Sequence, residues 1–367
     1  MSFRGTACSS PAGARLCAAG VVLALALQLG GCGSDSSPDP RAQVASAMQT
    51  SMKGDLTSLW QASVALQAAA PLPVGRGWDA ALDAAAIESM KMAWVQARTA
   101  YEHVEGATAP IFTDLDIAID ERYDGFLATL GVTGDPDPFD GVGVTGMHAI
   151  ERILYADVIP ANVVTFEQSL PGYAPAAFPA TEAQAAEFKN ALCAKLVADA
   201  RSLLDQWTPQ QIDVAGAFMG LEGLMNEQQE KVNKASSGEE ESRYSQRTMA
   251  DLRANLAGTT KIYELFSDWL TSRPATATVP ETGAQVDAVI KAAFASLSDV
   301  YMTIPGDAIP APPVTWSAEA PSGADLLTPF GRLYEAVHAE VDPTANGSVV
   351  FEMDRAALLL DIPVLSP

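Results

Sequence analysis

Residues 78–105 read WDAALDAAAIESMKMAWVQARTAYEHVE, and segments of this kind decide the fold class. The stretch is rich in alanine and other good helix formers, and its apolar residues recur at helical spacing with few strand-like alternations. The same pattern predicts six long helices, over residues 41–69, 78–104, 181–207, 209–235, 245–272 and 281–303. Shorter helices are predicted at 143–156, 322–340 and 350–361. The sequence therefore predicts an all-α protein.

Helices of this length joined by turns favour antiparallel bundles. Nine predicted helices are too many for one four-helix bundle, so we expect two antiparallel helical bundles in series. The first is expected over residues 44–207 and the second over residues 208–367. Two helix starts carry local signals, because Thr181 is a predicted N-cap and Thr208 is a predicted N-cap followed by proline.

Three connections are unusually long, at residues 106–142, 158–180 and 304–321. Loops of this length without regular structure are uncommon unless they form a site or are disordered. The first one is acidic and contains Asp114, Asp116, Asp120, Glu121, Asp124, Asp135, Asp137 and Asp140. We expect it to deliver carboxylates to the helix that follows.

The charge balance limits the range of partners. The chain has 367 residues, with 22 Lys and Arg against 45 Asp and Glu, and a formal charge of −23. Its first 31 residues hold two arginines and no acid, so the remainder carries −25. Nucleic acid is excluded as a partner, because phosphate contacts need clustered Lys and Arg. The acidity suits a surface that attracts cations.

The N-terminus predicts a lipoprotein signal peptide over residues 1–31. Arg4 and Arg15 form a basic region, and the apolar stretch CAAGVVLALALQL follows at 17–29. Thirteen residues are too few to span a bilayer comfortably, which favours a cleaved signal over a membrane anchor.

The sequence LGGC, ending at Cys32, resembles a bacterial lipobox and predicts cleavage before Cys32 and lipid on its sulfur. Ordinary secretion with an incidental cysteine is the alternative. Gly33 follows, which in Gram-negative lipoproteins is typical of passage to the outer membrane. We therefore expect a lipid-anchored protein of the cell envelope, facing the periplasm or at the cell surface, with a flexible tether over residues 32–43. Only Cys193 remains in the body, so no intramolecular disulfide is expected.

Two pairs of polar residues have the spacing of a metal site. His148 and Glu151 lie three apart in GMHAIERILYAD at 146–157, so their side chains project from neighbouring points of one helical face. Glu102 and Glu105 have the same spacing. Neutral imidazole and carboxylate are ligands that iron and zinc accept. We predict that the two pairs and an aspartate of the acidic loop provide four or five ligands.

Each pair alone also has an ordinary explanation. His-x-x-Glu occurs often by chance, and Glu102 with Glu105 could form a solvated face. His103 reads as an exposed neighbour, and His338 lacks a comparable set of acids. The sequence lacks the His-Glu-x-x-His motif of zinc peptidases, a phosphate-binding glycine loop and a Gly-x-Ser-x-Gly elbow.

Three blocks taken together resemble the imelysin-like family. GMHAIERILYAD resembles the family's Gly-x-His-x-x-Glu signature. AWVQARTAYEHVE at 93–105, followed by PIFTDLDIAIDER at 110–122, resembles the corresponding region of Efe-type iron-uptake lipoproteins. SGEEESRYSQRTMADLRANLAGTTKIYELF at 237–266 resembles the family's acidic, Tyr-Ser and Asn-x-x-Gly block, and is closer to the imelysin branch. The likeness covers roughly residues 45–270.

The resemblance implies an all-helical fold of two bundles, a periplasmic or surface location and a metal site around the histidine motif. His148 and Glu151 match the signature itself. Glu102, Glu105 and Asp116 match acidic positions of the iron-uptake branch. The chain resembles the short form of those proteins, without a preceding cupredoxin-like domain.

Three functions follow from these observations. We predict a lipid-anchored protein that binds a metal ion, iron first and zinc as the other candidate, for an uptake system. Its partners would then be the membrane and an iron permease or outer-membrane receptor. The runner-up is a metallopeptidase, because the family was first classed with peptidases and a bound metal can activate water. The third is a polysaccharide- or protein-binding surface lipoprotein whose histidine motif is structural.

The apolar residues of the histidine helix predict which way its polar pair points. Ile150, Ile153 and Leu154 must pack on the core, which fixes the roll of the helix. We therefore expect His148 and Glu151 to point into the first bundle, near the acidic pair at 102 and 105. Gly146 is expected to let the acidic loop approach closely and bring Asp116 to the cluster.

Overall fold

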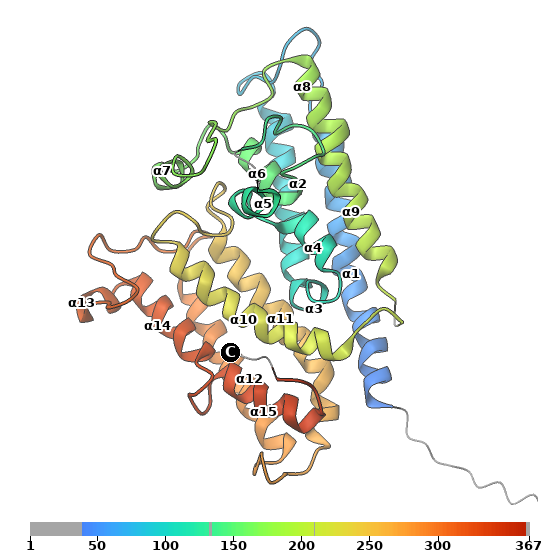
Figure 1. Cartoon of the computed structure of the whole chain (residues 1–367), viewed down its shortest axis with the longest axis vertical. Helices are drawn as coiled ribbons and strands as arrows, with labels where there is room; N and C mark the ends of the chain where they lie inside the picture. Colours follow the sequence, from blue (N-terminus) through green and yellow to red (C-terminus); the bar gives the residue numbers. More distant parts are fainter. Residues whose placement is uncertain (1–38, 132–133, 209, 365–367) are drawn as a thin grey trace, which may run out of the picture. The chain divides into compact units, whose positions relative to one another are not determined.

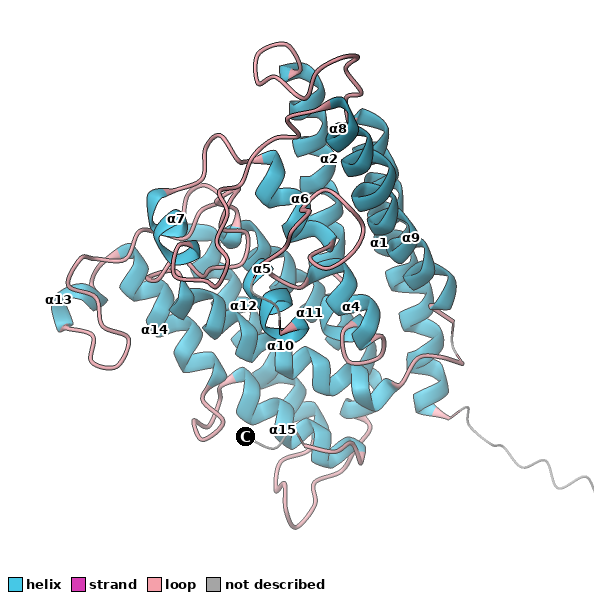
Figure 2. Cartoon of the chain, turned by 45° about the horizontal axis from the view of Figure 1, so that its top comes forward, coloured by secondary structure: helices cyan, strands magenta, loops and turns pink. Residues whose placement is uncertain are grey.

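The computed structural model describes residues 39–131, 134–208 and 210–364. The predicted signal peptide at 1–31, Cys32 and the first part of the predicted tether lie outside the described residues. Within those ranges every regular element is a helix and none is a strand, which confirms the all-α prediction (Figure 2). No described helix is both long enough and apolar enough to cross a membrane.

The helices are drawn in Figure 1. In chain order they are α1 (Pro40–Ala69), α2 (Ala84–Glu102), α3 (Glu105–Thr108), α4 (Thr113–Asp120), α5 (Tyr123–Leu130), α6 (Gly146–Leu154), α7 (Ala161–Glu167), α8 (Glu182–Glu187), the π-helical turn η1 (Phe188–Leu192), α9 (Cys193–Gln206), α10 (Val214–Lys234), α11 (Thr248–Thr271), α12 (Gly283–Thr303), α13 (Gly323–Leu326), α14 (Pro329–Val341) and α15 (Val349–Leu360).

The long helices lie where the apolar spacing predicts them, but several ends differ. Helix α1 begins at Pro40, inside the predicted tether. Thr181 is confirmed as an N-cap, since its hydroxyl accepts a hydrogen bond from the backbone N–H of Gln184 at 3.2 Å. The N-cap predicted at Thr208 is wrong, because α10 starts at Val214 and is capped by the Asp213 carboxylate. Caps are local and weakly specified by sequence, so such ends shift easily.

The connection at 106–142, expected to lack regular structure, contains α3, α4 and α5. These helices span 4, 8 and 8 residues, too short to show an apolar period. Helix α4 is supported at its start by Asp114, whose charge suits the positive end of the helix dipole. The acidic residues of this connection are therefore held by helices rather than by a loose loop.

The helices form two groups that meet within the unit formed by residues 38–367. Helix α1 packs along α2 and α9, while α10, α11, α12, α14 and α15 pack on one another (Figure 1). The groups touch where α10 and α11 pack against α3, and where α11 also packs on α1 and α2. The chain passes from one group to the other between α9 and α10. The division into bundles 44–207 and 208–367 stays a prediction.

Helix α6 is buried along its whole length, and one glycine allows this. Gly146 has a φ of +80°, and a Cβ built on it would lie 2.5 Å from the carbonyl oxygen of Ile119 and 2.8 Å from that of Ala118. The start of α6 therefore rests directly on the last turn of α4. This close approach carries Asp120, the residue after Ile119, towards the histidine helix.

Replacement of Gly146 by alanine is expected to destabilise the protein by about 2–4 kcal/mol, because it adds backbone strain and a clash with α4. Gly75→Ala is the matched control, since Gly75 has a φ of +72° but nothing within 4 Å of its Cβ position. That variant should lose only about 1 kcal/mol. Urea unfolding followed by circular dichroism measures both. Equal losses in the two variants would contradict the tight contact.

Candidate metal centre

The imidazole of His148 lies in the protein interior between three carboxylates. Its side chain is buried, with 1% of the residue exposed. Nδ1 is 3.0 Å from Oε2 of Glu151, and Nε2 is 3.2 Å from Oε1 of Glu241 and 3.6 Å from Oδ1 of Asp120. The other oxygen of Glu151 accepts the backbone N–H of Ser245 at 2.8 Å. Glu151 thus fixes the ring, and Nε2 faces two acidic oxygens, of which Oε1 of Glu241 is at hydrogen-bonding distance.

Three donor atoms at this point have the spacing of a metal site. Oδ1 of Asp120, Nε2 of His148 and a carboxylate oxygen of Glu241 all lie within 4.8 Å of one another. Ligand atoms about 2 Å from a metal stand roughly 3–3.5 Å apart. The separations of 3.2 and 3.6 Å from Nε2 therefore suit an ion placed among the three atoms.

A second group of acids shares Asp120 with the first. Glu102, Glu105 and Asp120 offer oxygens within 4.8 Å of one another, and all three residues are buried. Glu102 ends α2 and Glu105 begins α3, so a turn, not one continuous helix, brings them together. The two carboxylate oxygens of Glu102 face buried cations, Oε1 the guanidinium of Arg98 and Oε2 the amine of Lys231.

Two buried cations offset part of this negative charge. The guanidinium of Arg98 forms ion pairs with Glu102 and Asp120, and its Nη2 lies 3.1 Å from Glu241. Nζ of Lys231 lies 3.7–3.9 Å from oxygens of Glu102, Glu105 and Glu241. These two cations contact five acids, Glu102, Glu105, Asp120, Glu241 and Asp251, which outnumber them.

The Asn-x-x-Gly pattern of α11 supports the acidic turn. Asn255 donates to the backbone oxygen of Glu102 at 3.2 Å and to Oε2 of Glu105 at 2.9 Å. Its own side-chain oxygen accepts from Lys231 at 3.0 Å. A Cβ at Gly258 would lie 2.4 Å from the carbonyl oxygen of His103, so glycine lets α11 press against the end of α2. The pattern therefore has a structural reason in this chain.

The segment between α10 and α11 closes the cluster from the other side. Glu241 faces His148, and Ser245 donates to Glu151. Between them, the hydroxyl of Ser242 donates to Asp251 of α11. The sequence-based prediction, which relied on pairs of residues three apart, did not include four residues of the cluster: Glu241, Asp251, Arg98 and Lys231. Glu241 and Asp251 lie in the block at 237–266 that resembles the imelysin-like family, so this resemblance could have pointed to them.

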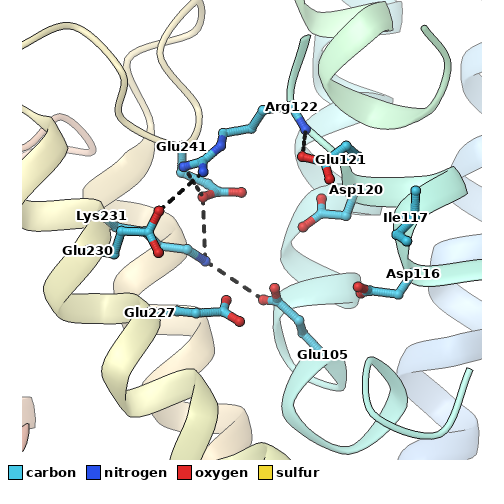
Figure 3. A pocket seen from close by; sticks show the side chains of 10 residues that line it. All are labelled: Glu105, Asp116, Ile117, Asp120, Glu121, Arg122, Glu227, Glu230, Lys231 and Glu241. Atoms are coloured by element: carbon cyan, nitrogen blue, oxygen red, sulfur yellow. Dashed lines mark hydrogen bonds and ion pairs between the residues drawn. The ribbon is translucent and has the colours of Figure 1, made fainter. Parts of the chain in front are cut away.

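A cavity of about 200 Å³ opens onto the carboxylate side of the cluster. Its walls are formed by Glu105, Asp116, Ile117, Asp120, Glu121, Arg122, Glu227, Glu230, Lys231 and Glu241. Figure 3 shows the charged side chains of α10 facing those of α3 and α4 across this space. Asp116 accepts a hydrogen bond from the hydroxyl of Tyr101 in this wall. A cation that enters the cavity therefore meets acidic oxygens on opposite sides.

Burial gives several of these acids an unusual affinity for protons. Burial, followed by repulsion from Glu105, raises the pKa of Asp116 to about 7 and that of Glu227 to about 8. Burial also raises the pKa of Glu102 and of Asp120. A bound metal would displace such protons, so its affinity should rise with pH.

Glu241 and His148 form an ion pair that burial opposes. Despite burial, Lys231 and the hydrogen bond to His148 hold the pKa of Glu241 well below its usual value. Burial would lower the pKa of His148, but hydrogen bonds to Glu151 and Glu241 outweigh it and raise that pKa. Without a metal, the histidine therefore tends to keep a proton between these acids.

The structure places the five predicted ligands as follows. His148 and Glu151 contact each other, and Glu102 and Glu105 lie next to Asp120. The interpretation of Glu102 and Glu105 as a solvated face is wrong, since their exposed fractions are 0% and 6%. Asp116 lines the cavity, while Asp120, one turn later on α4, is the aspartate that faces His148. Their roles as metal ligands stay predictions.

Comparison with known proteins found one matching family. The model of the imelysin family matches residues 60–310. Among solved structures, an imelysin-like protein from Psychrobacter arcticum 273-4 is similar, with a TM-score of 0.57 and 14% sequence identity. The match covers 90% of this chain and 99% of that chain, and at this identity it shows the fold alone. A comparison with curated proteins found no match.

The pKa of Asp116 predicts a stability difference between pH 5 and pH 8. Because the folded protein holds this proton up to about pH 7 and the unfolded chain loses it near 3.8, rising pH destabilises the metal-free fold. Asp116→Asn removes this pH dependence, because asparagine does not titrate, and its side-chain oxygen can still accept the hydrogen bond from the hydroxyl of Tyr101. We expect the free energy of unfolding of the variant, relative to that of wild type, to be higher at pH 8 than at pH 5 by on the order of 2 kcal/mol.

Urea unfolding in the presence of a chelator, at both pH values, measures this difference. Asp114→Asn is the control, because it removes one acid from an exposed position of the same helix. A gain by Asp116→Asn that does not exceed the control's would show that the buried proton is absent.

Proposed function

Because the chain belongs to the imelysin family, we propose that it captures a metal cation, iron in the first place, at the His148 cluster. One observation carries the proposal. Nε2 of the buried His148 faces acidic oxygens of both Asp120 and Glu241 at ligand spacing. The buried acids here outnumber the buried arginine and lysine that pair with them, and a metal cation would offset more of their charge.

The donor set favours a borderline metal. One imidazole nitrogen with several carboxylate oxygens suits iron and zinc, whereas magnesium and calcium prefer oxygen alone. Excess negative charge over Arg98 and Lys231 supports binding of a cation with two or more charges. The metal is cargo in this proposal, and the cavity between α4 and α10 is its way in.

The surroundings of the cluster support capture over peptide cleavage. The cavity of about 200 Å³ is smaller than the roughly 300–1,000 Å³ of ordinary ligand pockets, which leaves little room for a peptide. Glu151, the acid of the histidine motif, uses one oxygen for His148 and the other for Ser245. It is therefore a poor general base, because neither oxygen is free to accept a proton from water.

Location and partners extend the proposal on sequence grounds. We propose lipid attachment at Cys32, on the lipobox-like sequence that precedes it, and a position at the outer membrane or cell surface. A protein held at the membrane with a reversible metal site suits delivery to an iron permease or an outer-membrane receptor. The acidic surface of the chain would raise the local concentration of cations.

Metal titration of the purified protein tests the proposal. Calorimetry with Fe²⁺ under anaerobic conditions near pH 7 should show one strong site in the wild type. His148→Ala and Glu241→Gln should each weaken binding by at least about tenfold, because each removes a donor of the proposed site. His338→Ala is the control, since that half-buried histidine stacks on Tyr334 outside the cluster.

Two results would contradict this function. The first is absence of Fe²⁺ binding, or equal affinity in the wild type and both cluster variants. The second is metal-dependent cleavage of an unfolded protein that Glu151→Gln abolishes, which would establish the peptidase alternative instead.

A further inference from the structure

The guanidinium of Arg98 contacts the same atoms that the proposed metal site offers. Its Nη1 pairs with Oδ1 of Asp120, and its Nη2 lies 3.1 Å from Oε1 of Glu241. These two oxygens are also the ones that face Nε2 of His148. A metal held by Asp120, His148 and Glu241 would therefore meet the guanidinium at both of its acidic ligands.

We propose that Arg98 is a built-in competitor of the metal, a residue that holds the site's oxygens until a cation displaces it. The inference rests on the proposed function, since it concerns the same cluster. Arg98 is 2% exposed, so its charge stays in the interior and can only change partners there. A guanidinium is always charged and makes bidentate contacts with carboxylates, which makes it an effective substitute for a metal ion.

The structure provides a place for the displaced guanidinium. Among the described residues, Nε of Arg98 has no hydrogen-bond partner, and Oδ1 of Asp251 lies 3.6 Å away. Arg98 also pairs with Glu102, which is not one of the three facing donors. When a metal takes Asp120 and Glu241, Arg98 can keep Glu102 and tighten on Asp251. The exchange needs a shift of one side chain within a fixed helix.

Competition of this kind serves a protein that must release its cargo. Without Arg98, Asp120 would lose its arginine partner and Glu102 and Glu241 would each lose one cation, so the fold would depend more on the metal. With Arg98 present, the empty cluster is stable. The metal then binds less tightly, because its binding must break the ion pairs of Arg98 with Asp120 and Glu241. Arg98 therefore makes the site reversible.

Lys231 provides an internal comparison. It is buried and positively charged like Arg98, and it also faces Glu102 and Glu241. On these two acids it contacts the other oxygens, Oε2 of Glu102 at 3.7 Å and Oε2 of Glu241 at 3.9 Å. Removal of Lys231 changes the charge of the cluster by the same amount but frees neither of the oxygens that face His148.

The test compares Fe²⁺ affinity in the full-length wild type, Arg98→Met and Lys231→Met by anaerobic calorimetry. We expect Arg98→Met to bind Fe²⁺ at least about tenfold more tightly than wild type, and Lys231→Met to gain less. Thermal unfolding gives a second readout, because Fe²⁺ should raise the melting temperature of Arg98→Met more than that of wild type. Unchanged or weaker binding by Arg98→Met, or equal gains in both variants, would overturn the inference.

Two further outcomes are decisive. If Arg98→Met does not fold alone, the inference requires that Fe²⁺ restores its helical circular dichroism, and failure to do so overturns it. If neither wild type nor any variant binds Fe²⁺, the proposed function fails together with the inference. Tight binding by wild type without a gain in Arg98→Met would overturn the inference alone.

Discussion

Acidic side chains from five parts of the chain meet in the interior of this protein, and the cost of burying their charge governs the surrounding structure. An unpaired ion in the interior costs several kcal/mol even after relaxation. Arg98 and Lys231 each pair with more than one of these acids, and Asn255 donates to Glu105. His148 lies between Glu151 and Glu241. The helices that carry these residues pack closely because glycines at 146 and 258 remove side chains from the points of contact. Stability and the proposed metal binding therefore depend on the same set of groups.

The sequence allowed the local part of the cluster to be predicted. His148 and Glu151 lie on one helix, so a spacing of three was enough to place them together. Arg98 and Glu102 are four residues apart on one helix, so the same reasoning could have placed Arg98 in the predicted cluster. The helical class followed from alanine-rich segments with apolar residues at helical spacing, a signal that accumulates over many residues.

The long-range part could not be read in the same way. Asp116 and Asp120 are one turn apart on α4, and only the contact between Gly146 and Ile119 determines which one reaches His148. Glu241 is 93 residues from His148 along the chain, and no local pattern links the two. The short helices of the 106–142 connection were missed because elements of 4–8 residues show no period.

A metal ion bound among Asp120, His148 and Glu241, as we propose, can be located by crystallography with anomalous scattering. Crystals grown with Fe²⁺ under anaerobic conditions, with data collected at the iron absorption edge, would locate the ion. We expect one strong peak about 2 Å from Nε2 of His148, with oxygens of Asp120 and Glu241 around it and Arg98 turned towards Asp251. Crystals without an anomalous peak at this position, or with iron only on exposed acids and Arg98 still paired with Asp120, would contradict it.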